Sequence, residues 1–523
     1  MLQRALRNAS FTGLAASGQL VIGLLLVTNT IRVLGNERAG YLLTLQAVLA
    51  VGSVMGGLGF APATTRRLAV LIEKNELGRA RQCVEVISLL AAAAGALIAL
   101  ALILNVRSIV LWSRVGSAYK ADATLATVLM AGTFAVQQAG SVYASVYTGA
   151  QRFDLAALVN TSYALVTNSL GLALVHFWPS LTNLAPLVLC TSMVQLVVNA
   201  VLARRLLHAW LVPRWHTGEL GELRGFAGWA YVGSLGSLLV SQMDRVMITS
   251  LLGSAAVAVY ALPQRIVQSF HSVMGDQTSV LFPMLSGRAD LDAHLLERIS
   301  DRVRWLTASG AVFAYGGLSL VGIPMLALLV SPEFAARSRW IFYCAMLQGT
   351  FSALRIVPYY LSWAMGDARP NTIAINVQGF SAIVLMAVLI PRFGVIGAAI
   401  SQLVVIPVAI GNALWVGRMI RNKSTQPRMT PELSPYYGPG LALLVFLAGA
   451  MIQSRAPDVP NILMVSTGLG TLALAAFAWS IVERVTAPNE RRLDILRSLL
   501  SMLRQRARRL LTHSPDAECE PAA

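Results

Sequence analysis

Residues 84–104 read VEVISLLAAAAGALIALALIL, an apolar run with a single charged side chain, Glu85. A helix that crosses a bilayer core needs about 20 apolar residues, and lipid offers no hydrogen-bond partner to an exposed backbone. This stretch therefore predicts a membrane-spanning helix. Apolar residues make up 56% of the chain and charged residues 12%, with a mean hydropathy of +0.64, so the same interpretation extends to most of the protein.

Runs of this kind recur along nearly all of the 523 residues, and we predict fourteen spans. The alternating pattern of a membrane barrel is absent from them. The predicted fold class is therefore an all-α polytopic membrane protein. The predicted spans are 13–34, 40–62, 84–104, 123–148, 155–177, 184–203, 227–251, 256–283, 306–330, 339–361, 372–390, 394–417, 437–453 and 461–482.

Basic residues predict the orientation of these spans. Of the 41 Lys and Arg residues, 29 fall in the two tails and in the loops on the same side as the amino terminus. Basic residues near helix ends favour the cytoplasmic side, so both termini are predicted to be cytoplasmic. The same distribution explains the net charge of +17 by topology and contact with anionic lipid, and no nucleic-acid partner is expected. The cysteines, at 83, 190, 344 and 519, lack the spacing of a metal site or a disulfide framework.

An internal repeat organises the chain at an offset near 219 residues. The matching segments are Ser53–Gly56 with Ser272–Gly275, Tyr41 with Tyr260, and Leu34-Gly35 with Leu252-Gly253. Six predicted spans separate the two copies, an even number, so both copies enter the membrane in the same sense. This pattern predicts two parallel six-helix repeats around a central cavity, plus two extra carboxyl-terminal helices.

The predicted domain organisation follows from the repeat. Leucines and arginines segregate in the last part of the chain, which indicates an amphipathic helix at the cytoplasmic leaflet. The segments are an amino half (1–203), a cytoplasmic linker (204–226), a carboxyl half (227–420), helices 13 and 14 (437–482), the amphipathic helix (489–511) and a disordered tail (512–523).

Charged residues inside predicted spans are the first candidates for a functional site. A charge at mid-membrane costs about 2.5–3.5 kcal/mol on insertion scales and usually faces protein or water. Arg245, Arg265 and Arg355 predict anion binding, because a guanidinium group stays protonated and its planar fork of donors suits phosphate. Asp244 and Asp276 are the candidates for coupling to H+ or Na+. We expect Asp244 to pair with Arg265, leaving Arg245 and Arg355 for the anion.

Uncharged polar side chains share helix faces with these charges, at 100° per residue. The candidate substrate-binding residues are Arg245, Arg265, Arg355, Gln268, Gln348, Tyr359, Gln137 and Asn160. Such stripes also serve as contacts between transmembrane helices without any cavity, and that alternative stays open for the amides and hydroxyls.

Several motifs together carry a family resemblance. They are Gly57–Ala61 at the end of the second span, Gln242–Arg245 in the seventh, Leu281–Ser286 after the eighth and Gly394–Ala399 at the start of the twelfth. Over about the first 420 residues the chain resembles the Wzx-type polysaccharide and O-antigen flippases of the multidrug/oligosaccharidyl-lipid/polysaccharide exporter superfamily. The resemblance implies alternating access that moves a polyprenyl-pyrophosphate-linked oligosaccharide across a bacterial inner membrane for exopolysaccharide or O-antigen synthesis. It also implies a polysaccharide polymerase and a chain-length regulator as candidate partners.

Other functions stay open at this point. Lipid II flippases place cavity arginines in their first span and cation-coupled multidrug exporters an acidic residue there, whereas this first span offers only Gln19, Asn29 and Arg32. A membrane polysaccharide polymerase or ligase usually needs a substantial outer loop, and the longest one predicted is 105–122. A membrane scaffold would lack the cavity. We therefore expect a transporter without a cofactor, and no enzyme.

Overall fold

The computed structural model describes residues 2–57, 60–209, 212–216, 231–279, 293–365, 367, 369–423, 434–455 and 461–486. Every regular element in these ranges is helical. Eleven of the described helices are long and apolar enough to cross a membrane. The predicted all-α polytopic membrane class is confirmed.

The predicted count of fourteen spans goes beyond these eleven. Helix α1 (Leu2–Gly57) contains the first two predicted spans, because Gly35 breaks it with φ 81° and ψ 166°. The seventh is divided between the helix Tyr231–Ser241 and α9 (Met243–Leu252). The eighth is α10 (Ser254–Ser279), whose polar face keeps it outside the eleven. The described part of each predicted range thus falls on a helix. Membrane crossing by more than eleven helices stays a prediction.

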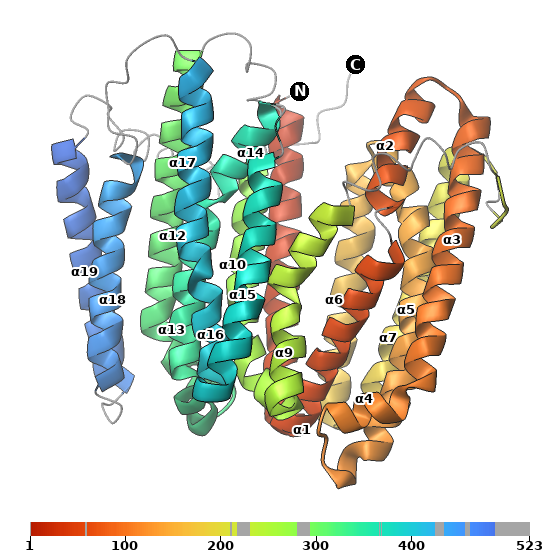
Figure 1. Ribbon diagram of the computed structural model, residues 1–523, viewed down its shortest axis with the longest axis horizontal. Helices are drawn as coiled ribbons and strands as arrows, with labels where there is room; N and C mark the ends of the chain where they lie inside the picture. Colours follow the sequence, from red (N-terminus) through yellow and green to blue (C-terminus); the bar gives the residue numbers. More distant parts are fainter. Residues whose placement is uncertain are drawn as a thin grey trace, which may run out of the picture. The chain divides into compact units, whose positions relative to one another are not determined.

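Figure 1 shows the remaining helices. They are α2 (Phe60–Glu73), α3 (Leu77–Leu104), α4 (Val106–Trp112), α5 (Lys120–Gly149), α6 (Phe153–Phe177), α7 (Leu181–Leu207), α12 (Ala293–Leu329), α13 (Pro332–Leu354), α14 (Ile356–Ala364), α15 (Arg369–Phe393), α16 (Val395–Ser401), α17 (Val405–Lys423), α18 (Tyr437–Arg455) and α19 (Asn461–Thr486), with short 3-10 turns η1 (Ser117–Tyr119), η2 (Gln402–Val404) and η3 (Ser434–Tyr436).

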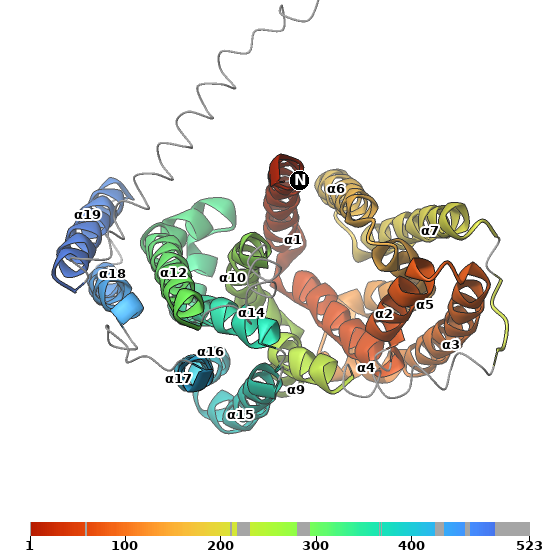
Figure 2. The ribbon, with the colours of Figure 1, turned by 90° about the horizontal axis from the view of Figure 1, so that it is seen from above.

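Contacts between residues divide the chain into two compact units. The first comprises Met1–Ala289 and Val321–Arg418, and the second comprises Asp290–Leu320 and Met419–Ala523. Both predicted halves lie largely in the first unit, where α1 packs against α6 and α10 (Figure 2). The boundary between the halves stays a prediction. The predicted helix 489–511, the tail 512–523 and much of the linker 204–226 lie outside the described residues.

Two one-residue turns correspond in the predicted repeat. Gly35 joins the two segments of α1 with φ 81° and ψ 166°, and Gly253 joins α9 to α10 with φ 90° and ψ 170°. This backbone region is open almost only to glycine, because a Cβ atom would clash there. Tyr41 and Tyr260, the paired tyrosines that follow, are both fully buried. The local structures therefore agree with the repeat detected in the sequence.

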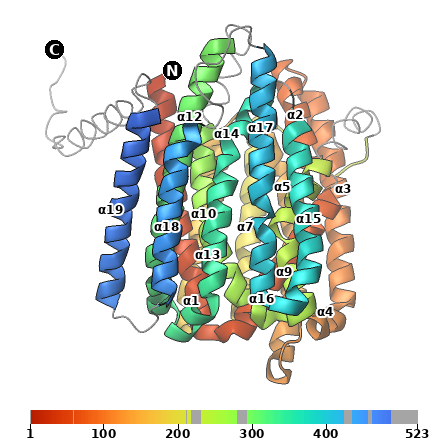
Figure 3. The same cartoon turned by 60° about the vertical axis from the view of Figure 1, so that its left-hand side comes forward.

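The second unit has its own core, built from the first part of α12 and from α18 and α19. Figure 3 shows α18 and α19 running side by side. Trp305 of α12 stacks on Trp479 of α19 with ring centroids 5.7 Å apart, and the Trp479 indole donates to Ser309 Oγ at 3.1 Å. Phe446 of α18 is buried against α12. These aromatic contacts fix the two extra helices to α12.

Replacing Gly316 by alanine is expected to loosen this core. A Cβ atom at Gly316 would lie 2.4 Å from the ring of Phe446, which is itself held edge-on by Phe313. Overpacking of this kind costs about 1–3 kcal/mol, so the thermal denaturation temperature in detergent should fall. The matched control is Gly317→Ala, since a Cβ atom there meets nothing within 4 Å. Equal denaturation temperatures for the two variants would contradict the packing described.

Candidate functional site

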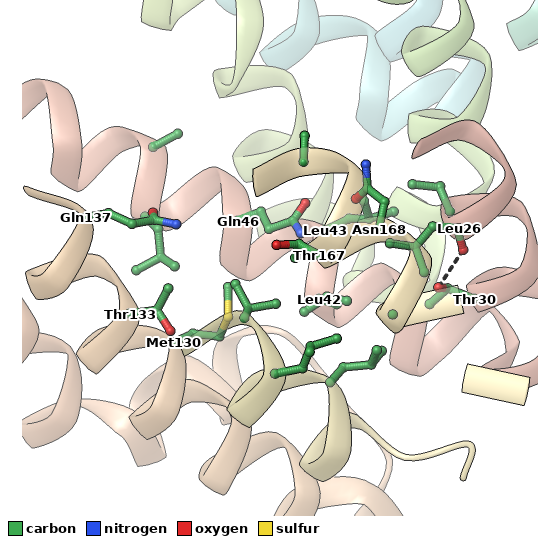
Figure 4. Close-up of a pocket in the computed structure, with 18 of the residues that line it drawn as sticks. Leu26, Thr30, Leu42, Leu43, Gln46, Met130, Thr133, Gln137, Thr167 and Asn168 are labelled. Carbon is green, nitrogen blue, oxygen red and sulfur yellow. Dashed lines mark hydrogen bonds between the residues drawn. The ribbon is translucent and has the colours of Figure 1, made fainter. Parts of the chain in front are cut away.

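A cavity of about 610 Å³ lies in the amino half of the first unit (Figure 4). Its volume falls within the range of about 300–1,000 Å³ typical of small-molecule sites. Both segments of α1 line it, together with α5, α6, α7 and one residue of α10. The polar lining residues are Thr30, Gln46, Ser53, Thr133, Gln137, Gln138, Ser141, Tyr163, Thr167, Asn168 and Arg265.

The cavity is mainly aliphatic at the end nearest the turn at Gly35, although Thr30 also lies there. Ile31, Ala39, Leu42 and Leu184 lie at this end, close to the starts or ends of their helices. Polar residues follow further along the same helices, from Gln46 to Ser53 on α1 and from Gln137 to Ser141 on α5. In the predicted orientation the aliphatic end faces the outer side of the membrane and the polar end faces the cytoplasm.

Gln137 of α5 occupies the predicted position at this cavity. Its Nε2 donates to Ser192 Oγ of α7 at 3.1 Å and to Tyr163 Oη of α6 at 3.2 Å. The Tyr163 and Ser192 hydroxyl groups also bond to each other at 3.0 Å. The stripe that the sequence indicated on α5 therefore serves both as a contact between helices and as part of a cavity wall.

Asn160 does not lie with Gln137. Its side chain is exposed on α6 and is not among the residues that line the cavity. Thr167 and Asn168, about two turns further along α6, line it instead. The sequence analysis also missed Gln46, which Figure 4 shows beside Thr167 and Asn168. Gln46 shares its helix face with Ser53 but with no charged residue, so the face gave only a weak signal in the sequence.

Arg265 enters the cavity from α10, across the contact between the two halves. A Cβ atom built on Gly23 would lie 4.0 Å from Arg265 Nη2 and 3.3 Å from Asn168 Nδ2. The absence of a side chain at Gly23 therefore leaves both polar groups uncovered. Among the described lining residues, Arg265 alone carries a charge.

The predicted pair of Asp244 and Arg265 is not formed, since no ion pair joins the two in the described part of the chain. Asp244 is 5% exposed at the start of α9, where its Oδ1 accepts a hydrogen bond from the Arg245 backbone N–H at 2.7 Å. It faces the buried Tyr260 of α10. Arg265 lies five residues after Tyr260, about 140° around the helix, and therefore points elsewhere.

Arg245 and Arg355 are held within the carboxyl half. Arg245 is 6% exposed beside Asp244. Arg355, at the end of α13, donates from Nη1 to Gln378 Oε1 of α15 and faces His271 of α10. Neither arginine is among the residues that line the described cavity.

The remaining predicted residues have mixed positions. Gln348 is buried and accepts a hydrogen bond from Gln264 Nε2 at 2.8 Å, so it joins α13 to α10. Gln268 is half-buried, and Tyr359 is 37% exposed with its ring edge-on to Tyr360. None of the three lines the described cavity. The side chain of Asp276 lies outside the residues whose side chains the structure describes.

Contacts between the halves gather near the aliphatic end of the cavity. The Ser254 backbone N–H donates to the Ser113 carbonyl oxygen at 2.9 Å, and the Thr44 and Thr249 hydroxyl groups lie 2.9 Å apart. A Cβ atom on Gly40 would lie only 2.0 Å from the Ser254 carbonyl oxygen. The halves are therefore in backbone contact at this end, which the predicted orientation places on the outer side.

A family model described as "Polysaccharide biosynthesis protein" matches residues 5–287, more than half of the chain. The chain belongs to this family. The expectation of a transporter agrees with this family and with the similarity to proteins named as flippases. A curated relative, "Probable flippase AglR" of Haloferax volcanii, is 24% identical over 302 residues, or 56% of this chain. The chain spans 57% of the length of that relative.

Solved structures show the same superfamily fold. The lipid II flippase MurJ in an inward closed conformation is similar with a TM-score of 0.68 and 13% identity, over 91% of this chain and 99% of that one. An inward-facing multidrug resistance transporter of the MATE family gives 0.64 and 13% identity, over 78% and 96% of the two chains. The chain is thus a multi-pass membrane protein whose fold is similar to that of these two transporters, in agreement with the resemblance found in the sequence.

Proposed function

We propose that the protein flips a polyprenyl-pyrophosphate-linked oligosaccharide across a bacterial inner membrane, for exopolysaccharide or O-antigen synthesis. The observation that carries this proposal is the Arg265 guanidinium, the one charged group among the described lining residues, in a cavity that also presents amides, hydroxyl groups and apolar side chains. A fixed cation suits the pyrophosphate, and the amides and hydroxyl groups suit sugars. The polyprenyl chain stays in the bilayer, so the cavity holds only the polar head.

In this mechanism the two halves alternate between inner and outer access. The contact of Thr44 and Gly40 with Thr249 and Ser254 closes the outer end, so the cavity receives substrate from the cytoplasmic side. Separation of this contact then releases the head group on the other side. Fourteen spans with both termini cytoplasmic complete the proposed topology.

The direct test is flipping by the purified protein in proteoliposomes. A fluorescent short-chain polyprenyl pyrophosphate bearing one defined saccharide is placed in one leaflet, and a membrane-impermeant reagent scores its arrival in the other. Movement above that in protein-free vesicles is expected. Flipping of a phospholipid probe at the same rate would point to a scramblase and would overturn the proposal.

Asp244 is the proposed site of coupling to H+ or Na+. Its carboxylate is buried with Arg245 where a spanning helix is interrupted at Gln242, and interrupted helices place ion sites near mid-membrane. Removing Asp244 alone leaves a buried charge, which costs about 3–5 kcal/mol, so the informative variant is Asp244→Asn combined with Arg245→Gln. We expect this double variant to fold and bind substrate but to lose the acceleration of flipping by an imposed pH or Na+ gradient. Acceleration equal to that of the unmodified protein would exclude Asp244 from coupling.

A further inference from the structure

We propose that Gln137 is the specificity-determining residue for the saccharide attached to the pyrophosphate. This inference rests on the proposed function and adds to it which part of the head group is recognised, and by which atom. It assigns the pyrophosphate to Arg265 and the first saccharide to the neighbouring polar wall of α5 and α6.

The amide of Gln137 has a fixed orientation. Its Nε2 atom donates to both Tyr163 Oη and Ser192 Oγ, at 3.2 Å and 3.1 Å. Those hydroxyl groups are joined at 3.0 Å, and Ser192 is only 2% exposed, so the triangle is anchored behind the cavity wall on α7. The Nε2 side of the amide is thereby turned toward the two hydroxyl groups. The Oε1 atom accepts no hydrogen bond from a described residue and is left as an acceptor on a side chain that lines the cavity.

The residues beside Gln137 and beside Arg265 are offset along α6. Asn168 meets Arg265 at Gly23, and Tyr163, which holds Gln137, lies five residues earlier on α6. At 1.5 Å per residue, this offset is about 7.5 Å along the helix axis. Figure 4 shows Gln137 apart from the group formed by Gln46, Thr167 and Asn168. The anion site and the Gln137 acceptor are therefore two separate polar sites along one cavity.

The cavity wall near these two polar sites offers both kinds of contact that a sugar ring needs, polar contacts for its hydroxyl groups and apolar contacts for its C–H groups. Gln46 offers hydrogen bonds to hydroxyl groups, while Met130 offers an apolar surface to C–H groups (Figure 4). An acceptor whose direction is fixed bonds a hydroxyl group in one configuration and not its epimer. A site of this kind discriminates because the wrong epimer leaves polar groups unpaired. Gln137 acts on the sugar, and Ser192 is a positioning residue.

The experiment measures binding of short citronellyl pyrophosphates to the full-length protein in detergent. One probe has no sugar, and the others carry glucose, galactose, N-acetylglucosamine or N-acetylgalactosamine. We expect the unmodified protein to prefer one sugar over its 4-epimer by about tenfold, the value of one good hydrogen bond. Gln137→Leu should reduce this ratio to about one and leave the affinity for the sugar-free probe unchanged.

Ser192→Ala should also reduce the ratio of affinities for the two epimers to about one, although Ser192 is not a lining residue. Asn160→Ala, on the exposed face of α6, is the matched control and should keep the ratio. Equal binding of all sugars by the unmodified protein, or a preserved ratio in Gln137→Leu, would overturn the inference about Gln137. Neither result affects the proposed function, whose failure would appear separately as binding of the sugar-free probe that does not depend on Arg265.

Discussion

Replacing Arg265 by alanine is expected to reduce flipping of a pyrophosphate-linked saccharide by about 10- to 150-fold. A hydrogen bond to a charged group contributes about 1.5–3 kcal/mol, and the described lining of the cavity holds no second charge to replace it. The guanidinium is exposed and forms no ion pair with a described residue, so the fold should tolerate its loss. Arg265→Lys keeps a point charge but not the planar fork and should recover only part of the activity.

The measurement is flipping in proteoliposomes, together with the denaturation temperature of each variant. Arg107→Ala is the control, because Arg107 is an exposed arginine of α4, outside the cavity. Full activity of Arg265→Ala at normal protein abundance would remove the anion site from the cavity. Arg245→Ala and Arg355→Ala provide a contrast. Both residues are packed within the carboxyl half, so their loss should lower stability as well as activity.

Replacing Gly40 by leucine is expected to hold the halves apart at the outer end and to stop transport. A Cβ atom at this position would lie 2.0 Å from the Ser254 carbonyl oxygen, and backbone atoms cannot move aside as a flexible side chain can. A penalty of about 1–3 kcal/mol on the closed state shifts the equilibrium between the states by about 5- to 150-fold. The protein should therefore accumulate with its outer end open.

Cross-linking provides the readout for this shift. Cysteines introduced as Thr44→Cys and Thr249→Cys in a background without the native cysteines should form a disulfide, because the two hydroxyl groups lie 2.9 Å apart. The disulfide should form readily with Gly40 present and slowly with Gly40→Leu. Gly275→Ala, a helical glycine of α10 with nothing within 4 Å of a built Cβ atom, is the control. Equal cross-linking rates in all three backgrounds would show that the outer contact does not gate the cavity.

Composition and repeats were enough to predict the class of fold. Apolar runs predict helices because membrane backbone has no other hydrogen-bond partners, and each predicted span falls on a helix. The Leu-Gly pairs were matching segments of the repeat, and Gly35 and Gly253 have nearly the same backbone angles. Here the sequence signal is strong because the conformation accepts almost no residue but glycine.

The site was harder to predict. Helical periodicity shows which residues share one face of a helix, but it does not show what that face contacts. Arg245 and Arg265 both lie on polar stripes, yet one packs beside Asp244 and the other enters the cavity. Which face meets a cavity depends on how helices pack, and no pattern within one helix contains that information. Gln137 and Ser141 share the polar stripe of α5 and both line the cavity, while binding of substrate by Gln137 stays a prediction. Gln46 shares its face of α1 with Ser53, seven residues later, but no charged residue marks that face.

The one-residue turns at Gly35 and Gly253 limit how this transporter can move. A connection of a single residue cannot lengthen. Neither helix of a hairpin can therefore slide along its partner by one helical turn while the turn keeps its conformation. Each hairpin must then move as one rigid unit that pivots near its glycine turn, which the predicted orientation places on the outer side. Motion of individual helices is confined to interruptions elsewhere, such as the one at Gln242, which lies next to the buried Asp244 and Arg245.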